Sequence, residues 1–545
     1  MVCGEVRGIK REIISNIPDY LASLGRNLFP NLNIFVVLVL NSRVLSEGKY
    51  IGIQIQELCM KLFFSLLFSI TFTTPAWAEI IQILHTNDLH SHLEHSMHLP
   101  DVGGYARLKS LIASQRAEAS QKGIGTISMD GGDFMEGSIY YLADKGRKTF
   151  EAFNDLGHDV AVLGNHDYLM APTDLDAILR DVPGKHALLA ANFKVDSKYT
   201  HINEQIKPVW EGIVSGVKVG VIGLTTNDFL YKWRLEGDGG MMNEYKTAER
   251  WAKYLRSRGA EVVIALTHIG VKKDKILAKK VPEIDLIVGG HSHTALHEVI
   301  YQESKNKKII PIVQAGDYGE WLGRLLMDYD RDSKTLKVVD YKLLPVVGQE
   351  KDPQMISLIA DANRDLHDEY GEEWLNETVG ESTLRPLNLD DAKVWHYFMN
   401  DAMMEATGAD FAIHAPALSG KNFPVGTVSR RSLYDSNPRT FDMSDKYGYN
   451  IHTAKIMGGW IKMIAVVCIK MNIPLYFSGL KFKWTRTSKG KVRIWDVTHN
   501  GKKIHPFKYY NVAFSEGIVR GAYEISKLTH FVIHEGRNVK LPMWL

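Results

Sequence analysis

Asp, Asn and His residues follow five short apolar segments of this chain, and their types and spacing suit metal binding. The segments with their polar ends are IIQILHTNDLHSH (Ile80 to His92), GTISMDGGD (Gly125 to Asp133), DVAVLGNHD (Asp159 to Asp167), EVVIALTHIG (Glu261 to Gly270) and IDLIVGGHSH (Ile284 to His293). Carboxylate oxygens and neutral imidazole nitrogens are ligands that divalent cations such as Zn²⁺ and Mn²⁺ accept. The polar ends therefore predict metal chemistry.

The apolar segments are the elements that must position these residues. Short runs of Val, Ile and Leu are typical of buried parallel strands. Side chains just beyond the carboxyl ends of such strands converge on one crevice, where open α/β sheets bind their ligands. We therefore expect the five polar ends to form a single site.

The local spacing supports this interpretation. Asp88 and His90 are two residues apart, so on an extended strand end both side chains point the same way, and His291 and His293 repeat that spacing. Glycines precede three of the polar ends and allow tight turns close to an ion. The predicted ligands are Asp88, His90, Asp133, Asn165, His268, His291 and His293.

The bulk properties set limits on the function. A chain of 545 residues is too long for one core, so two or more domains are expected. A net charge of +2 offers no electrostatic reason to expect a nucleic-acid polymer or a membrane surface as partner. Three cysteines exclude a disulfide scaffold.

The N-terminal region predicts export. Met60-Lys61, the apolar run Leu62 to Phe72 and a closing Ala-Trp-Ala form a signal peptide over residues 60–78, which places the mature protein in the periplasm or the medium. Residues 1–59 are then expected to be a spurious extension from a misassigned start codon, the alternative being a genuine extension. No cysteine follows Ala78 directly and no apolar tail ends the chain, so no stable membrane anchor is expected.

The remaining pattern indicates two α/β domains. Residues 79–346 alternate apolar strands with helical stretches such as Ala106 to Gln121, which predicts a layered α/β fold whose later strands (Ile309 to Gln314, Arg324 to Asp330 and Thr335 to Leu343) close a second sheet. Residues 347–372 contain an amphipathic linker helix from Pro353 to Tyr370. A smaller α/β domain is expected over 373–545, with helices at Ala392 to Ala406 and Ile456 to Cys468.

The motifs NDLHSH, GGDF, GNHD, THIG and GHSH, in this order, resemble those of the calcineurin-like metallophosphoesterases, and more closely those of the two-domain bacterial 5′-nucleotidase family. The resemblance implies an α/β-β-α metallophosphoesterase domain followed by a divergent 5′-nucleotidase-like substrate domain. It also implies that Asp88, His90 and His293 hold one metal, that Asn165, His268 and His291 hold another, and that Asp133 bridges them.

Two divalent ions about 3.5–4 Å apart can clamp a phosphate and lower the pKa of a bound water, whose hydroxide then attacks phosphorus. The ligand types suit Zn, Mn, Fe or Co alike. By the resemblance, His166 stabilises the phosphoryl oxygens or protonates the leaving group, beside Asn165. The family places a partner Asp three residues after this His, where the chain has Leu169; Asp167 or Asp174 could replace it.

The second domain matches the resemblance less well. The family stacks a nucleoside base between two aromatic side chains and binds phosphate with arginines. One aromatic corresponds to Tyr447 in KYGYN, whereas the second motif is absent from FSEGIVRGAYEI (Phe514 to Ile525). The candidate arginines, by residue type alone, are Arg385, Arg430, Arg431 and Arg520.

Together these features predict an exported dinuclear-metal phosphoesterase that hydrolyses phosphate monoesters of nucleotides by hydroxide attack. The alternatives keep the metal chemistry and change the substrate to a nucleotide sugar, a cyclic nucleotide, a non-nucleotide phosphate or a thiosulfate-type ester. A third possibility is an inactive descendant that binds a ligand or a surface partner.

Overall fold

The computed structural model describes residues 79–96, 99, 101–168, 171–227, 238–383, 389–416, 425–438, 448, 450–471, 474–518 and 534–542. All of these ranges belong to one compact unit, residues 78–545. The described residues do not include the predicted N-terminal extension, the predicted signal peptide, Leu169, Tyr447, Arg385 or Arg520.

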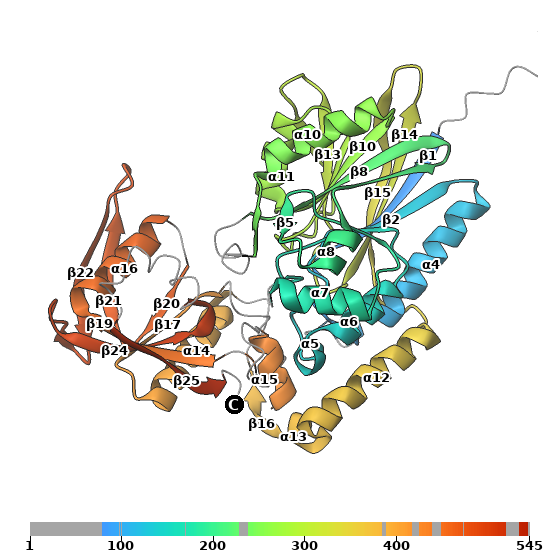
Figure 1. Ribbon diagram of the computed structural model, residues 1–545. Coiled ribbons are helices and arrows are strands. Elements are labelled where there is room, and N and C mark those ends of the chain that lie inside the picture. Colours follow the sequence, from blue (N-terminus) through green and yellow to red (C-terminus); the bar gives the residue numbers. More distant parts are fainter. Residues whose placement is uncertain are drawn as a thin grey trace, which may run out of the picture. The chain divides into compact units, whose positions relative to one another are not determined.

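A seven-stranded sheet carries the first three polar strand ends (Figure 1). Its order is β15 (Thr335–Pro345), β14 (Trp321–Asp330), β1 (Glu79–Thr86), β2 (Gly125–Asp130), β3 (Val160–Val162), β4 (Ala187–Leu189) and β6 (Ile206–Lys207). Strands β1 to β4 run parallel to one another, and β14 runs antiparallel to β1.

The expectation that the last two strands close a second sheet is wrong. Strand β14 pairs with β1 from Glu79 opposite Tyr329 to His85 opposite Gly323. The buried His85 ring occupies the space at Gly323, where an added Cβ would come within 2.0 Å of Nε2. This fit favours β14 as the neighbour of β1, and β15 follows it as a hairpin.

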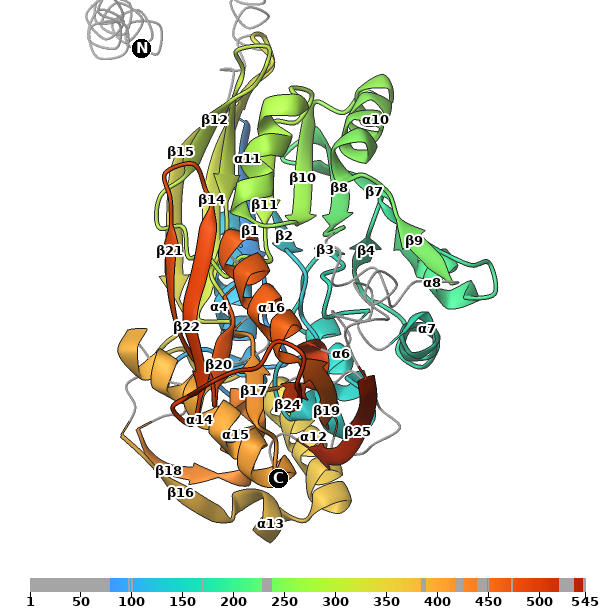
Figure 2. The same cartoon turned by 90° about the vertical axis from the view of Figure 1, so that its left-hand side faces the viewer.

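A six-stranded sheet carries the other two polar strand ends (Figure 2). Its order is β12 (Ile300–Glu303), β13 (Ile309–Val313), β11 (Leu286–Gly289), β10 (Val262–His268), β8 (Val217–Thr225) and β7 (Val209–Val214). Of the three later strands predicted for a second sheet, only the one beginning at Ile309 lies here.

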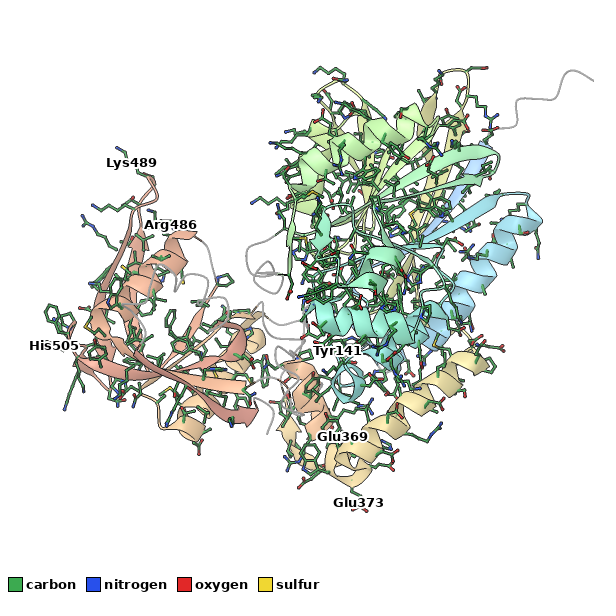
Figure 3. All side chains as sticks on the ribbon, viewed as in Figure 1. Tyr141, Glu369, Glu373, Arg486, Lys489 and His505 are labelled. Atoms are coloured by element: carbon green, nitrogen blue, oxygen red, sulfur yellow. The ribbon has the colours of Figure 1, made fainter. Side chains whose placement is uncertain are left out.

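Three apolar clusters hold these layers together, and they confirm the α/β-β-α fold. One cluster combines side chains of both sheets, such as Ile83 and Ile264. A second lies under α4 (Tyr105–Gln121), α5 (Tyr140–Asp144), α6 (Arg147–Asn154) and α7 (Pro172–Asp181), and includes Tyr141, labelled in Figure 3. The third lies under α10 (Glu244–Ser257) and α11 (Val271–Lys280).

Helix α12 (Pro353–Tyr370) has the bounds that the sequence predicted. Asp352 caps it by accepting a hydrogen bond from the Met355 amide at 2.8 Å, and Pro353 occupies the first turn. Its buried residues Met355, Ile359 and Leu366 pack into the cluster beneath α4 to α7. Its role as a linker stays a prediction.

The C-terminal region contains a five-stranded mixed sheet. Its order is β20 (Tyr476–Ser478), β17 (Phe411–His414), β24 (Tyr509–Ser515), β19 (Asn450–Met457) and β25 (His534–Pro542). Helices α14 (Leu389–Thr407) and α16 (Gly458–Met471) correspond to the two predicted helices. This confirms a second, smaller α/β domain.

Shorter elements make up the rest of the secondary structure in the described residues. They are α8 (Thr200–Gln205), α13 (Glu372–Asn376), α15 (Arg430–Ser436), β5 (Phe193–Val195), β9 (Gly239–Met241), β16 (Thr378–Ser382), β18 (Gly426–Ser429), β21 (Lys481–Arg486), β22 (Val492–His499) and β23 (Lys502–Lys503). Among the helices that the structure describes, none is long and apolar enough to cross a membrane.

Candidate metal centre

The loops after β1, β2, β10 and β11 meet where the two sheets face each other. The amide of Asp88 donates to the carbonyl of Gly132 at 2.8 Å, and Nδ1 of His268 lies 2.7 Å from the carbonyl of Gly131. The amide of His291 donates to the carboxylate of Asp88 at 2.9 Å. The predicted site therefore draws on the strand ends of both sheets and not on the edge of a single open sheet.

Six of the seven predicted ligands gather into two groups. Their ligand atoms lie within 4.8 Å of one another in the triad Asp88, His90 and His293, and again in the triad Asp133, His268 and His291. Oδ2 of Asp133 lies 2.9 Å from Nε2 of His268 and 3.8 Å from Nε2 of His90. Asp133 thus touches both groups, as a bridging ligand must.

The seventh predicted ligand, Asn165, provides a test of whether a cation fits. Its side chain is buried, and neither amide atom has a hydrogen-bond partner among the described residues. An unpaired buried amide costs about 1–3 kcal/mol. A cation bound through the amide oxygen would offset that cost, so this residue fits the predicted site.

The histidines present their Nε2 atoms toward the site because their Nδ1 atoms are held from behind. Nδ1 of His90 donates to the carbonyl of Glu136 at 2.7 Å, and Nδ1 of His268 donates to Gly131. Nδ1 of His293 lies 3.2 Å from the carboxylate of Asp317. A donor Nδ1–H leaves the Nε2 lone pair available to a metal.

Backbone strain concentrates at the same residues. Five of the predicted ligands have positive φ angles, a conformation that costs a non-glycine residue about 1–3 kcal/mol. They are Asp88 (54°), His90 (49°), Asp133 (59°), His291 (80°) and His293 (51°). Strain of this kind persists only where surrounding contacts impose it, and it marks functional sites.

The charges of the ligands depend on one another. Burial opposes a charge on His293, but the nearby carboxylates of Asp88 and Asp317 outweigh burial and raise its pKa to about 10. Burial likewise opposes a charge on His268, and Asp133 raises its pKa to about 9. The protonated histidines therefore balance the negative charge of the carboxylates, and a bound metal cation would displace the protons from the histidines.

His166 lies beside the two groups, with a carboxylate that the sequence did not predict as its partner. Its Nε2 is 4.0 Å from Oδ2 of Asp133, and its Nδ1 pairs with Oε2 of the buried Glu136. Of the two predicted partners, Asp167 accepts hydrogen bonds from backbone amides and Asp174 accepts one from Lys145.

Three positioning residues were missed by the sequence analysis. Asn87 donates to Asp88 Oδ2 at 2.6 Å and accepts from the Ala315 amide at 2.7 Å, while Asp317 and Glu136 support His293 and His166. The position of Glu136, three residues after Asp133 in GGDFMEG, was the one available signal. Asp317 is distant in sequence and carried none.

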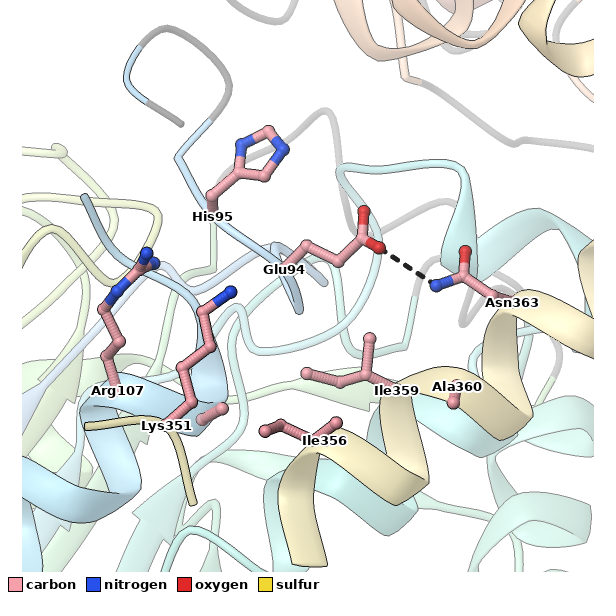
Figure 4. Close-up of a pocket in the computed structure, with 9 residues that line it drawn as sticks. Glu94, His95, Arg107, Lys351, Ile356, Ile359, Ala360 and Asn363 are labelled. Carbon is pink, nitrogen blue, oxygen red and sulfur yellow. Dashed lines mark hydrogen bonds between the residues drawn. The ribbon is translucent and has the colours of Figure 1, made fainter. Parts of the chain in front are cut away.

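A cavity of about 400 Å³ lies away from these ligands, between α4 and α12 (Figure 4). Its lining includes Glu94, Arg107, Lys351, Ile359 and Asn363, and none of the predicted ligands. Of the candidate arginines, Arg431 donates to Glu94 at 3.1 Å and Arg430 donates to Glu377 at 2.9 Å. Both described arginines are thus held by carboxylates.

Comparisons with known proteins identify both domains. Residues 81–295 match the calcineurin-like phosphoesterase family, and residues 378–530 match the 5′-nucleotidase C-terminal domain. The chain is 29% identical to the 5′-nucleotidase of Mus musculus over 343 residues, which cover 58% of this chain and 58% of that protein. The chain therefore spans a little more than half of the length of this curated relative.

Solved structures share the fold over most of the chain. A 5′-nucleotidase precursor from Thermus thermophilus superposes with a TM-score of 0.71 at 21% identity, covering 85% of this chain and 94% of that one. The sulfate thiohydrolase SoxB from the same organism superposes with a TM-score of 0.65 at 16% identity, covering 87% and 94%. These similarities establish the two-domain architecture.

Proposed function

This chain combines a calcineurin-like phosphoesterase domain with a 5′-nucleotidase C-terminal domain, and on that premise we propose that it is an exported, metal-dependent hydrolase of nucleotide phosphate monoesters. The observation that carries the proposal is the position of Asp133, whose carboxylate belongs to one ligand group and lies 3.8 Å from Nε2 of His90 in the other. A shared carboxylate is the arrangement that two neighbouring cations require.

Each residue of the site has a proposed role. Asp88, His90 and His293 would hold one divalent cation, Asn165, His268 and His291 the other, and Asp133 both. When bound, such a pair of cations polarises a phosphate ester and lowers the pKa of a bound water. His166, with Nε2 facing the ligand groups, would donate a proton to the oxygen of the departing alcohol.

The substrate class rests on the second domain. Its match to the 5′-nucleotidase C-terminal domain and the likeness to proteins named 5′-nucleotidase support a nucleotide, with Tyr447 as the proposed base contact. The fold shared with a sulfate thiohydrolase supports the alternative, in which the same site cleaves another phosphate ester or a thiosulfate-type ester.

A substrate panel tests this proposal. Metal-loaded protein is assayed with nucleoside 5′-monophosphates, sugar phosphates, a nucleotide sugar, a cyclic nucleotide, a thiosulfate ester and an aryl phosphate. We expect the nucleoside monophosphates to have the highest kcat/KM. Turnover of the aryl phosphate with none of any nucleotide would reject the nucleotidase assignment.

A pair of variants tests whether the site is catalytic at all. Asp133→Ala removes the shared carboxylate, and Asp332→Ala, in the exposed turn between β14 and β15, is the matched control. We expect loss of more than 10³-fold in kcat/KM for the first and no change for the second. Unchanged activity in Asp133→Ala would reject the metal mechanism, and elemental analysis of the purified protein should find two metal ions per chain.

Export and the domain limits are part of the same proposal. The apolar run and Ala-Trp-Ala directly precede β1, which begins at Glu79, so cleavage after Ala78 would leave the fold intact. The intact mass of protein recovered from the producing cell should correspond to residues 79–545. A mass that retains residues 1–59 would show that the extension is translated.

A further inference from the structure

We propose that Glu136 is the positioning residue of His166, in place of a carboxylate on the loop that carries His166. This inference rests on the proposed phosphoesterase function and assigns one residue within it. It starts from the contact between Nδ1 of His166 and Oε2 of Glu136, two side chains that are 7% and 0% exposed.

The backbone of Glu136 is fixed independently of His166. Its carbonyl accepts the hydrogen bond from Nδ1 of His90 at 2.7 Å. At the next residue, Gly137, an added Cβ would come within 2.4 Å of the His90 side chain, so the chain passes directly against this ligand. One residue therefore orients a predicted metal ligand through its carbonyl and His166 through its carboxylate.

The carboxylates nearer to His166 in sequence have other partners. Asp167 accepts hydrogen bonds from the amides of Gly164 at 2.6 Å and Met135 at 2.9 Å. Asp174 lies in the first turn of α7 and accepts from Lys145 at 3.0 Å. Glu136 supplies the carboxylate at Nδ1 from the loop after β2.

The chemical consequence follows from the geometry. A carboxylate at Nδ1 keeps a proton on that nitrogen and stabilises the imidazolium form, whose Nε2–H points to the ligand groups. As the bond from phosphorus to the ester oxygen breaks, the Nε2 proton passes to that oxygen and the alcohol leaves. The proton released by the attacking water then restores Nε2–H, so the cycle balances.

The leaving group separates this role from a merely structural one. A nucleoside alkoxide needs the proton, whereas p-nitrophenolate leaves without it. We expect Glu136→Gln to lower kcat for a nucleoside monophosphate by about 10²-fold and kcat for p-nitrophenyl phosphate by less than about threefold. The control Glu118→Gln, on α4, where Glu118 is partly exposed and pairs with Lys122, should match the wild type for both.

A second background shows whether Glu136 acts through His166. In His166→Asn, adding Glu136→Gln should cause no further loss with the nucleoside substrate. Equal losses on both substrates, or the same loss in the His166→Asn background, would overturn the proposal. A wild type that hydrolyses no phosphate ester would instead reject the proposed function.

A measurement on the unaltered protein keeps the test valid if Glu136→Gln folds poorly. Nitrogen-15 spectra of histidine-labelled, metal-loaded protein, with His166 assigned from the spectrum of His166→Asn, should show the proton of its Nδ1 in a strong hydrogen bond. An unprotonated Nδ1 would overturn the proposal without any change at Glu136.

Discussion

The carboxylates of Asp133 and Asp167 each accept a backbone hydrogen bond from the loop that carries the other residue. The amide of Asp133 donates to the carboxylate of Asp167 at 3.0 Å, and Oδ1 of Asp133 accepts from the amide of His166 at 2.8 Å. The amides of Met135 and Gly164 also donate to Asp167. These hydrogen bonds tie the loops after β2 and β3 together around Asp133, the predicted bridging residue, and Asp167 is structural support for it.

This relationship predicts a large effect of Asp167→Ala. Three buried amides would lose their acceptor, at about 1–3 kcal/mol each, so the free energy of unfolding should fall by at least about 3 kcal/mol. Denaturant unfolding of the variant and of the control Asp332→Ala provides the measurement. A loss below about 1 kcal/mol would contradict the proposed support.

Two glycines with left-handed backbones allow a matched test of close approach in the site. A side chain would strain the backbone at both Gly132 (φ 87°) and Gly123 (φ 70°). An added Cβ at Gly132 would also lie 2.7 Å from the Gly164 amide nitrogen, whereas an added Cβ at Gly123 would have no atom within 4 Å. Gly123→Ala should cost about 1 kcal/mol of stability, which is the backbone effect alone.

Gly132→Ala should cost at least about 2 kcal/mol more than Gly123→Ala and weaken metal binding at least tenfold, because the new methyl group forces the loop away from His268. Unfolding curves and calorimetric metal titration measure the two effects. Equal metal affinity in both variants would show that the close approach does not shape the site.

A buried histidine outside the ligand groups predicts sensitivity to acid. Burial lowers the pKa of His158 to about 3, and its ring lies between Thr86 Oγ1 at 3.1 Å and Ser128 Oγ at 3.0 Å. Below about pH 6.5 His158 binds a proton in the unfolded chain, whereas in the folded protein it stays neutral down to about pH 3. Protonation therefore favours unfolding between these two pH values.

This residue should therefore reduce the free energy of unfolding by up to about 1.4 kcal/mol per pH unit as the pH falls from about 6 to 4. The His158→Asn variant should have a lower free energy of unfolding than the wild type at pH 7, and this free energy should fall less steeply than that of the wild type as the pH decreases. Parallel slopes for wild type and variant over this range would contradict the assignment.

The contact between Arg431 and Glu94 predicts an energetic coupling between α15 and the loop after β1. Arg431 also lies over the ring of Tyr140 at 4.9 Å, and Tyr434 of the same helix is fully buried in the cluster beneath α4 to α7. The pair is partly exposed, so a double-mutant cycle of Glu94→Ala and Arg431→Ala should give a coupling of about 1 kcal/mol.

Hydrogen exchange localises this effect. Amides of residues 430–436 should exchange faster in Arg431→Ala, while those of β1 should be unaffected, because the strand is held by its two neighbours. Faster exchange throughout the first sheet would mean that the variant destabilises the whole domain and not the contact alone.

The sequence by itself determined the ligand types, the strands before them and the limits of α12. Apolar runs, glycines and a helix start at Pro353 are local signals, and they depend on residues adjacent in the chain. The spacing of two residues correctly put Asp88 and His90 in one group, but the left-handed backbone at His291 and His293 sends those two side chains to different groups, which a local strand pattern does not predict.

Tertiary structure decided what lies opposite each of these residues. Strand β14 pairs with β1, where the buried His85 fills the space that Gly323 leaves, and no local pattern reports such a fit across more than 200 residues. The partner of His166 likewise comes from another loop. Asp167 and Asp174 already accept other hydrogen bonds, and Glu136 pairs with Nδ1 of His166. Only the folded chain shows which carboxylates already have other partners.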